Sequence, residues 1–472
     1  MRAAQLLRGY RPLIAVASPI AGIQLAQVAL TTTDLVMMGS LSLRAIAAGG
    51  LAITLYNQLR TMCVGVVTAV GNLVAGAAGR GEARSGTRQL DERAREEVSQ
   101  IGRSSFLVAT LVGLLGGVLL VALSYALTLF GQDSLVLELA RPTMMALAPG
   151  LIPMLWLNVL RQFAVGMRRP GSLLGVTCAS IAVNAGLDGG FAYGWFGFPV
   201  LGLPGIGLAT TVVQLLNFGA FLAILRRDRI LSPLLSIQAW KADAATVRSV
   251  LRLGVPISLT YGSEAGITSV ATLMMGNFGP AALAAQNVVN QLAYIVYQVN
   301  IGLSQGSSVL VSRAIGQGNG AEARHIARRA ISLGFAIMTV VGLAYILIPL
   351  PILRLFLEKD ADPTVESMAR TLLFFAIAQQ FLKGTQNINI GLLRGLGNTR
   401  GGFRITLVGY WVIGIPAMLL FAYGLHMRGP GVWTGLCAGF GATAILLLRR
   451  FRLELRPEQS DDARLQCGRS SH

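Results

Sequence analysis

The chain has 472 residues, of which 53% are hydrophobic and 13% are charged, and its formal net charge at pH 7 is +18. Soluble globular domains are usually about 25% charged, so this composition excludes an ordinary soluble protein and indicates a chain whose main solvent is lipid. The Lys and Arg residues lie in short connectors between apolar runs, not on one amphipathic face or recognition motif, which argues against a nucleic-acid partner.

Apolar runs of bilayer-spanning length follow one another along the whole chain. The first begins at Leu13 and is too long for the core of a signal peptide, so we expect it to be retained as a membrane span. The predicted spans are residues 13–38, 46–77, 104–130, 136–165, 171–194, 203–225, 252–276, 281–312, 331–357, 364–393, 403–424 and 430–448.

The connectors between these spans alternate in charge. Residues 78–103 and 226–252 are rich in Arg, and both follow even-numbered spans, so they fall on one side of the membrane. The opposite connectors are short and poor in Lys and Arg, or acidic, as at Glu358, Asp360 and Asp362. Because Lys and Arg accumulate in cytoplasmic loops, we predict a multi-pass protein of the inner membrane with both termini in the cytoplasm.

The sequence contains an internal repeat. Residues 19–81 align without a gap with residues 256–318, and 16 of the 63 positions are identical. Six spans in each half, both starting inside, make the two copies parallel, which is a transporter layout. The predicted parts are an N-terminal lobe (1–225), a cytoplasmic connector (226–251), a C-terminal lobe (252–449) and a cytoplasmic tail (450–472).

Three stretches carry a resemblance to a known family. Asp34–Gly39, Gly65–Gly79 and Leu393–Arg400 stand in an order and spacing that resemble the multidrug and toxic compound extrusion (MATE) family over nearly the whole chain. The resemblance implies an all-α membrane protein with twelve helices in two lobes around a V-shaped central cavity. It also implies export of small organic molecules driven by a proton or sodium gradient, with the transported ion in place of any cofactor.

Two other transport functions remain open beside drug export. One is a flippase for a lipid-linked saccharide of the same superfamily, and the other is an exporter of an anionic metabolite. A membrane-embedded enzyme is disfavoured, because the sequence has no His or Cys cluster, no plausible metal-ligand set and no nucleophile with a base in reach. We expect a monomer in the lipid bilayer, without a bound metal.

Among the charged residues inside predicted spans, those to explain are Asp34, Arg60, Asp188, Glu264 and Lys383. A charge at mid-bilayer costs at least about 2.5–3.5 kcal/mol, so each calls for a function or for a structural partner.

The first lobe carries a candidate cation site. Asn184 and Asp188 are four residues apart and share one helix face, and Asp34 lies late in the first span. Carboxylates with an amide oxygen can hold a proton or coordinate a hard cation, although a purely structural cluster remains the alternative. The family resemblance matches these three residues and Thr210 to the first-lobe cation site of some members.

The second lobe departs from the family pattern. Glu264 matches the acidic residue of that lobe, whereas Lys383 stands where one sodium-coupled branch has an acid. An ammonium group there repels a metal ion, so we predict an ion pair between Glu264 and Lys383 in place of a second sodium site.

Four residues are candidates for a substrate cavity, namely Arg60, Tyr261, Tyr294 and Tyr297. Aromatic surfaces adapt to many shapes, but Tyr on a membrane helix is also an ordinary packing residue. Arg60 either neutralises Asp34 or, with Lys383, favours anionic or zwitterionic substrates.

Overall fold

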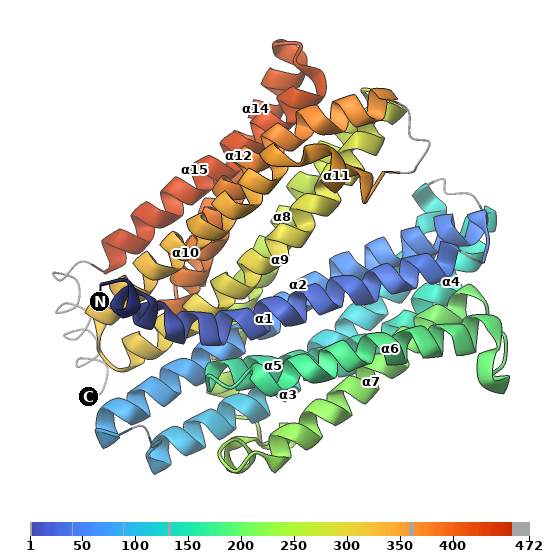
Figure 1. Cartoon of the computed structure of the whole chain (residues 1–472). Helices are drawn as coiled ribbons and strands as arrows, with labels where there is room; N and C mark the ends of the chain where they lie inside the picture. The colour runs from blue at the N-terminus through green and yellow to red at the C-terminus, as the bar shows by residue number, and fades with distance from the viewer. Residues whose placement is uncertain (1, 40, 88, 131–133, 358–362, 456–472) are drawn as a thin grey trace. The chain divides into compact units, whose positions relative to one another are not determined.

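A computed structural model describes residues 2–39, 41–87, 89–130, 134–357 and 363–455, and Figure 1 shows the path of the chain. The described part is helical almost throughout and contains no strand. This helical content confirms the predicted all-α class. The acidic connector residues Glu358, Asp360 and Asp362 lie outside the described part, as does the tail beyond residue 455.

The N-terminal half contains six long helical segments. The fourth predicted span, residues 136–165, is built from α4 and α5, which a single 3-10 turn at Ala148–Gly150 joins. The helices of this half are α1 (Arg2–Gly39), α2 (Leu43–Ser85), α3 (Glu92–Ala126), α4 (Ser134–Leu147), α5 (Leu151–Gly166), α6 (Gly171–Tyr193) and α7 (Leu203–Arg227).

The C-terminal half has six corresponding segments, with two irregularities. The short helix α11 follows α10, and π-helical stretches at Val408–Gly414 and Leu420–Gly424 flank α14. The helices are α8 (Ala244–Gly276), α9 (Pro280–Gly316), α10 (Gly320–Leu347), α11 (Pro349–Arg354), α12 (Pro363–Gly395), α13 (Thr399–Leu407), α14 (Ile415–Leu419) and α15 (Arg428–Glu454).

The helical segments agree in number and place with the predicted spans. In the described part, nine of them are long and apolar enough to cross a membrane. The three others, α8, α9 and α12, have 33, 37 and 33 residues and carry more polar side chains, including Glu264 and Lys383. The twelve-span architecture follows, with its most polar spans in the second half.

Two compact units make up the fold. One is Ser18–Gly262, and the other comprises the described residues of Met1–Ala17 and Ser263–His472. Within the first unit, α2 packs against α3, α4 and α5, while α7 packs against α4, α5 and α6. Within the second, α12 packs against α9, α10 and α15. Each unit has its own apolar core, centred on residues such as Phe163 and Phe221 in the first and Tyr410 and Trp433 in the second.

Glycines allow α2 and α8 to approach closely within the first unit. A Cβ atom added at Gly65 would lie 2.6 Å from the Cα atom of Ser258, and one added at Gly254 would overlap the carbonyl oxygen of Val66. Both neighbours are backbone atoms, which cannot rotate away. Membrane helices without a hydrophobic driving force between them depend on such small residues for van der Waals contact.

We therefore expect Gly254→Ala to destabilise the protein by about 1–3 kcal/mol, because the added methyl group forces the two backbones apart. Thermal unfolding of the purified protein, followed by size-exclusion chromatography, measures the change. Gly219→Ala in α7 is the matched control, since nothing lies within 4 Å of its added Cβ atom. Equal melting temperatures for the two variants would refute the close-packing role of Gly254.

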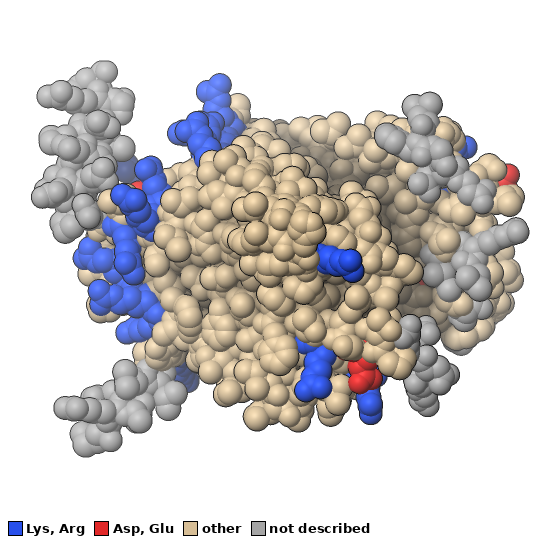
Figure 2. All heavy atoms as spheres, turned by 90° about the horizontal axis from the view of Figure 1, so that it is seen from above, with Lys and Arg blue, Asp and Glu red and all other residues tan. Residues whose placement is uncertain are grey.

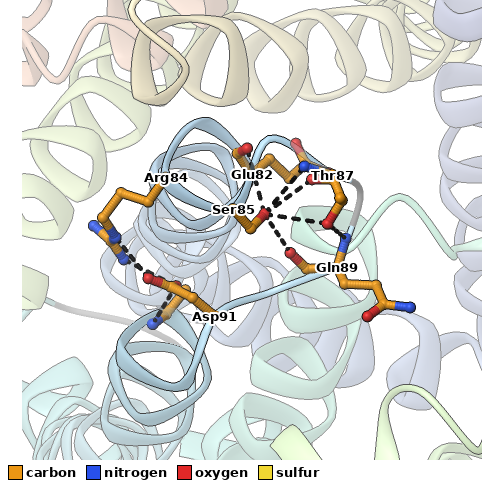
Figure 3. A network of polar contacts seen from close by, with 7 residues as sticks. Glu82, Arg84, Ser85, Thr87, Gln89 and Asp91 are labelled. Atoms are coloured by element: carbon orange, nitrogen blue, oxygen red, sulfur yellow. Dashed lines mark hydrogen bonds and ion pairs between the residues drawn. The ribbon is translucent and has the colours of Figure 1, made fainter.

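Polar contacts order the Arg-rich connector between α2 and α3 (Figure 3). The Arg84 Nε atom donates to Asp91 Oδ2 at 2.7 Å, and Asp91 Oδ1 accepts from the backbone N–H of Ala94 at 3.0 Å, so Asp91 caps α3. The Ser85 hydroxyl donates to the Gln89 carbonyl oxygen at 2.9 Å. The hydrogen bond from Arg84 holds the pKa of Asp91 below its ordinary value.

Basic side chains concentrate at particular helix ends. Arg residues occupy the last turns of α2, α7, α9, α12 and α15, which are the ends that the charge pattern predicts on one side of the membrane. In Figure 2, Lys and Arg gather mainly at one end of the face in view, beside a broad surface with few charges. That separation suits a protein whose middle zone contacts lipid.

Candidate functional site

The four predicted first-lobe residues meet in the structure. They come from α1 (Asp34), α6 (Asn184 and Asp188) and α7 (Thr210). The Asn184 Nδ2 atom donates to Asp34 Oδ1 at 2.6 Å and to Asp188 Oδ2 at 2.9 Å, and the Thr210 hydroxyl lies 3.5 Å from Asp34 Oδ2. One amide group thus bridges two carboxyl groups on different helices.

This cluster is deeply buried and incompletely satisfied. Asn184 and Asp188 are 0% exposed, and Asp34 is 7% exposed. Among the described residues, Asp188 Oδ1 and Asn184 Oδ1 have no hydrogen-bond partner. A buried acceptor oxygen without a partner costs free energy, and a proton or a hard cation removes that cost. The described part of the chain contains no group of three or more His, Cys, Asp or Glu residues suited to a metal ion.

A small cavity of about 40 Å³ adjoins the cluster within the first unit. Asp34 and Thr210 line it, together with Tyr56, Arg60 and Arg161. Arg60, a predicted cavity residue, lies close enough to Asp34 for an electrostatic interaction between the two side chains. The cavity is therefore lined by one carboxyl group of the acidic cluster and by two basic side chains, those of Arg60 and Arg161.

Arg161 is a charged residue of this site that the sequence reasoning missed. It lies in α5, is 8% exposed, and packs its guanidinium group over the Phe221 ring at 5.6 Å. The available signal was an Arg inside the apolar run 136–165, near the predicted end of that span.

Glu264 and Lys383 form an ion pair in the second unit. The Lys383 Nζ atom lies 3.1 Å from Glu264 Oε1, and the Tyr297 hydroxyl donates to Glu264 Oε2 at 3.2 Å. The ammonium group also lies 4.4 Å from the Tyr297 ring centre and 5.2 Å from the Phe440 ring centre. Lys383 thus supplies the positive charge that Glu264 would otherwise take from a bound cation.

The other predicted cavity residues have different surroundings. Tyr294 stacks on Tyr297 with ring centres 6.3 Å apart, so these two lie beside the Glu264–Lys383 pair. Tyr261 belongs to the first unit, where its ring lies against Gly65 of α2. Among the residues lining the cavity beside Asp34, only Arg60 comes from the predicted substrate set.

Comparison with known proteins gives consistent matches. The profile of the MatE family matches residues 19–188 and 256–420. A Pseudomonas aeruginosa protein described as probable multidrug resistance protein NorM is 34% identical over 465 residues, covering 97% of this chain and 93% of that relative. The multidrug resistance protein NorM of Burkholderia vietnamiensis is 31% identical over 443 residues, covering 93% of this chain and 92% of that relative.

Solved structures share the fold at lower sequence identity. The eukaryotic MATE transporter AtDTX14 superposes with a TM-score of 0.78 at 20% identity, covering 95% of this chain and 99% of that one. An outward-facing multidrug resistance MATE family transporter of the MOP superfamily gives a TM-score of 0.83 at 17% identity, covering 96% of this chain and 98% of that one.

Proposed function

Because the chain belongs to the MatE family of multidrug efflux transporters, we propose that it exports organic compounds across the inner membrane in exchange for a cation. The coupling site is the cluster of Asp34, Asn184, Asp188 and Thr210. The observation that carries the proposal is the single Asn184 amide that bridges two buried carboxyl groups and leaves further oxygen atoms without partners. The family transports its substrates and is not a family of enzymes.

The chemistry of the cluster suits a proton or a sodium ion. The Asp34 and Asp188 carboxyl groups lie close enough to share a hydrogen bond, and a shared proton relieves the repulsion between them. A sodium ion would instead take carboxylate, amide and hydroxyl oxygens as ligands. Either ion makes the charge of the cluster less negative by one, and the two charge states favour different arrangements of α1, α6 and α7.

Transport then follows because the coupling ion and the substrate bind preferentially to different conformational states of the protein. The coupling ion stabilises one arrangement of the two lobes (residues 1–225 and 252–449, joined by residues 226–251), and the substrate stabilises the other. We further propose that the protein acts as a monomer and that both of its termini lie in the cytoplasm. The Arg-rich helix ends support this orientation of the termini.

The second lobe plays a different part in this proposal. A metal ion at Glu264 would have to displace the Lys383 ammonium, which is tethered to α12 and sits between two aromatic rings. Lys383 therefore acts as a built-in counter-ion, and one ion site, in the first lobe, drives the exchange.

Efflux from proteoliposomes tests this function. A fluorescent organic cation is loaded inside, and pH and sodium gradients are imposed separately. We expect one of the two gradients to drive efflux and the other to have no effect. Efflux driven by neither gradient would refute ion-coupled export, and the Asp34→Asn variant provides the baseline without coupling.

A further inference from the structure

The lining of the first-unit cavity carries more basic than acidic side chains. Two guanidinium groups, those of Arg60 and Arg161, line the cavity against the single carboxyl group of Asp34. Among the described residues neither Arg forms an ion pair or a hydrogen bond, and the Nε atoms of both are buried without a partner. Arg161 is 8% exposed, so little of its charge reaches bulk solvent.

Such an arrangement is costly without a counter-ion. Arg remains protonated in proteins, and an uncompensated buried charge destabilises the folded state. The two guanidinium groups also lie close enough to repel each other. Asp34 carries at most one negative charge, so it cannot neutralise both guanidinium groups.

The rest of the lining offers hydrogen-bond donors. Asn217 is 6% exposed and faces the cavity with three other side chains that carry amide groups. These are Gln27, Asn57 and Gln214. Two fixed cations surrounded by neutral donors are the chemistry that recognises an anion.

We propose that this cavity binds a small monovalent anion, held by Arg60 and Arg161 beside the cation cluster. The size of the cavity limits the ligand: about 40 Å³ holds roughly three water molecules, which is room for a halide or a carboxylate group and not for a whole drug. The anion is thus either a free chloride ion or the carboxylate of a transported compound that extends out of the cavity.

Anion binding and proton binding assist each other in this site. Protonation of Asp34 removes the one negative charge from the cavity lining and leaves both guanidinium groups, which increases the attraction for an anion. By thermodynamic linkage, the anion raises the proton affinity of Asp34 by the same factor. The anion is therefore a partner of the cation at Asp34 and not its competitor.

Thermal unfolding of the purified full-length protein tests the site without any transport assay, so its result is independent of the proposed antiport. Chloride, bromide and acetate are titrated against a bulky sulfonate, the HEPES anion, at constant ionic strength and constant sodium. We expect chloride and bromide to raise the melting temperature with saturation, as a ligand of the native state does. Identical melting curves in chloride and in the sulfonate would overturn the proposal.

Variants locate the anion. Arg161→Gln and Arg60→Gln are each expected to weaken the apparent chloride affinity about tenfold or more. Asp34→Asn is expected to strengthen it about fivefold or more. The control is Arg141→Gln, because Arg141 lies in α4 over the Tyr125 ring and outside the cavity lining. Unchanged chloride affinity in both cavity variants, or the same loss in Arg141→Gln, would place the anion elsewhere and refute the site.

Two further arms identify the source of the anion. If acetate stabilises the wild-type protein as chloride does, and the free acid of a fluorescent substrate is exported faster than its methyl ester, the carboxylate of the substrate occupies the cavity. If only halides stabilise the protein and acid and ester are exported equally, the ligand is a free halide.

Discussion

Replacing Asp34 by Asn is expected to abolish drug efflux while the protein still reaches the membrane in normal amounts. Asn keeps the size of the side chain and can still accept the Asn184 hydrogen bond, which in the native chain spans 2.6 Å. It cannot carry a negative charge, so the cluster keeps one carboxyl group, that of Asp188, and can no longer hold an ion between two carboxyl groups. The coupling between ion and substrate then disappears, because neither state is favoured over the other by the ion.

Efflux of a fluorescent cation from energised cells measures this effect, with the membrane content of each variant determined on the same samples. Asp243→Asn is the matched control. Asp243 is exposed at the start of α8 and caps it by accepting from the Thr246 backbone N–H at 2.9 Å, and Asn is an equally good cap. Full efflux by Asp34→Asn at the wild-type protein level would show that coupling occurs elsewhere.

The second large effect is expected at the Glu264–Lys383 pair. Glu264→Gln leaves the ammonium group without its carboxylate, and Lys383→Met leaves a carboxylate that is 8% exposed without its cation. Each single variant should therefore lower thermal stability. The double variant should be more stable than the sum of the two losses predicts, by about 1–3 kcal/mol, since it leaves no unpaired charge.

Melting temperatures of the four proteins in one detergent complete the double-mutant cycle. The control pair is Arg169→Gln with Asp228→Asn, an ion pair of 2.9 Å whose Arg side chain is 46% exposed and whose coupling should be small. A double variant at Glu264 and Lys383 that shows strictly additive losses would mean that the pair contributes nothing beyond its separate packing.

The sequence predicted that Asp34, Asn184 and Asp188 belong together because these residues obey simple rules. Asn184 and Asp188 are one helical turn apart, and Asp34 is a carboxylate inside an apolar run. What the sequence does not contain is the distance between α1 and α6, so the bridging role of the Asn184 amide emerged only from the fold.

Arg161 escaped prediction for a related reason. The predicted span 136–165 includes Arg161, but the sequence does not show that α7 packs against α5 and that Phe221 covers the Arg161 guanidinium group. Some helix ends also differ from the predicted spans. Helix α3 begins at Glu92, well before the predicted start at residue 104, because the Asp91 cap extends the helix into water.

The π-helical stretch at Val408–Gly414 had no periodic signal at all. Gly409 and Gly414 pack against α15, and a Cβ atom at Gly414 would lie 3.4 Å from the Gly439 Cα atom. Such local widening of a helix depends on its neighbour and not on its own sequence.

The ammonium group of Lys383 also bears on how steep a gradient the exporter can sustain. A tethered cation is never released, so in the proposed mechanism only the ion at the first-lobe cluster carries charge across the membrane in each cycle. One elementary charge crossing 100 mV delivers about 2.3 kcal/mol, which corresponds to roughly a 50-fold accumulation of a neutral substrate. A transporter with ion sites in both lobes would square that ratio at the expense of a second ion per molecule exported.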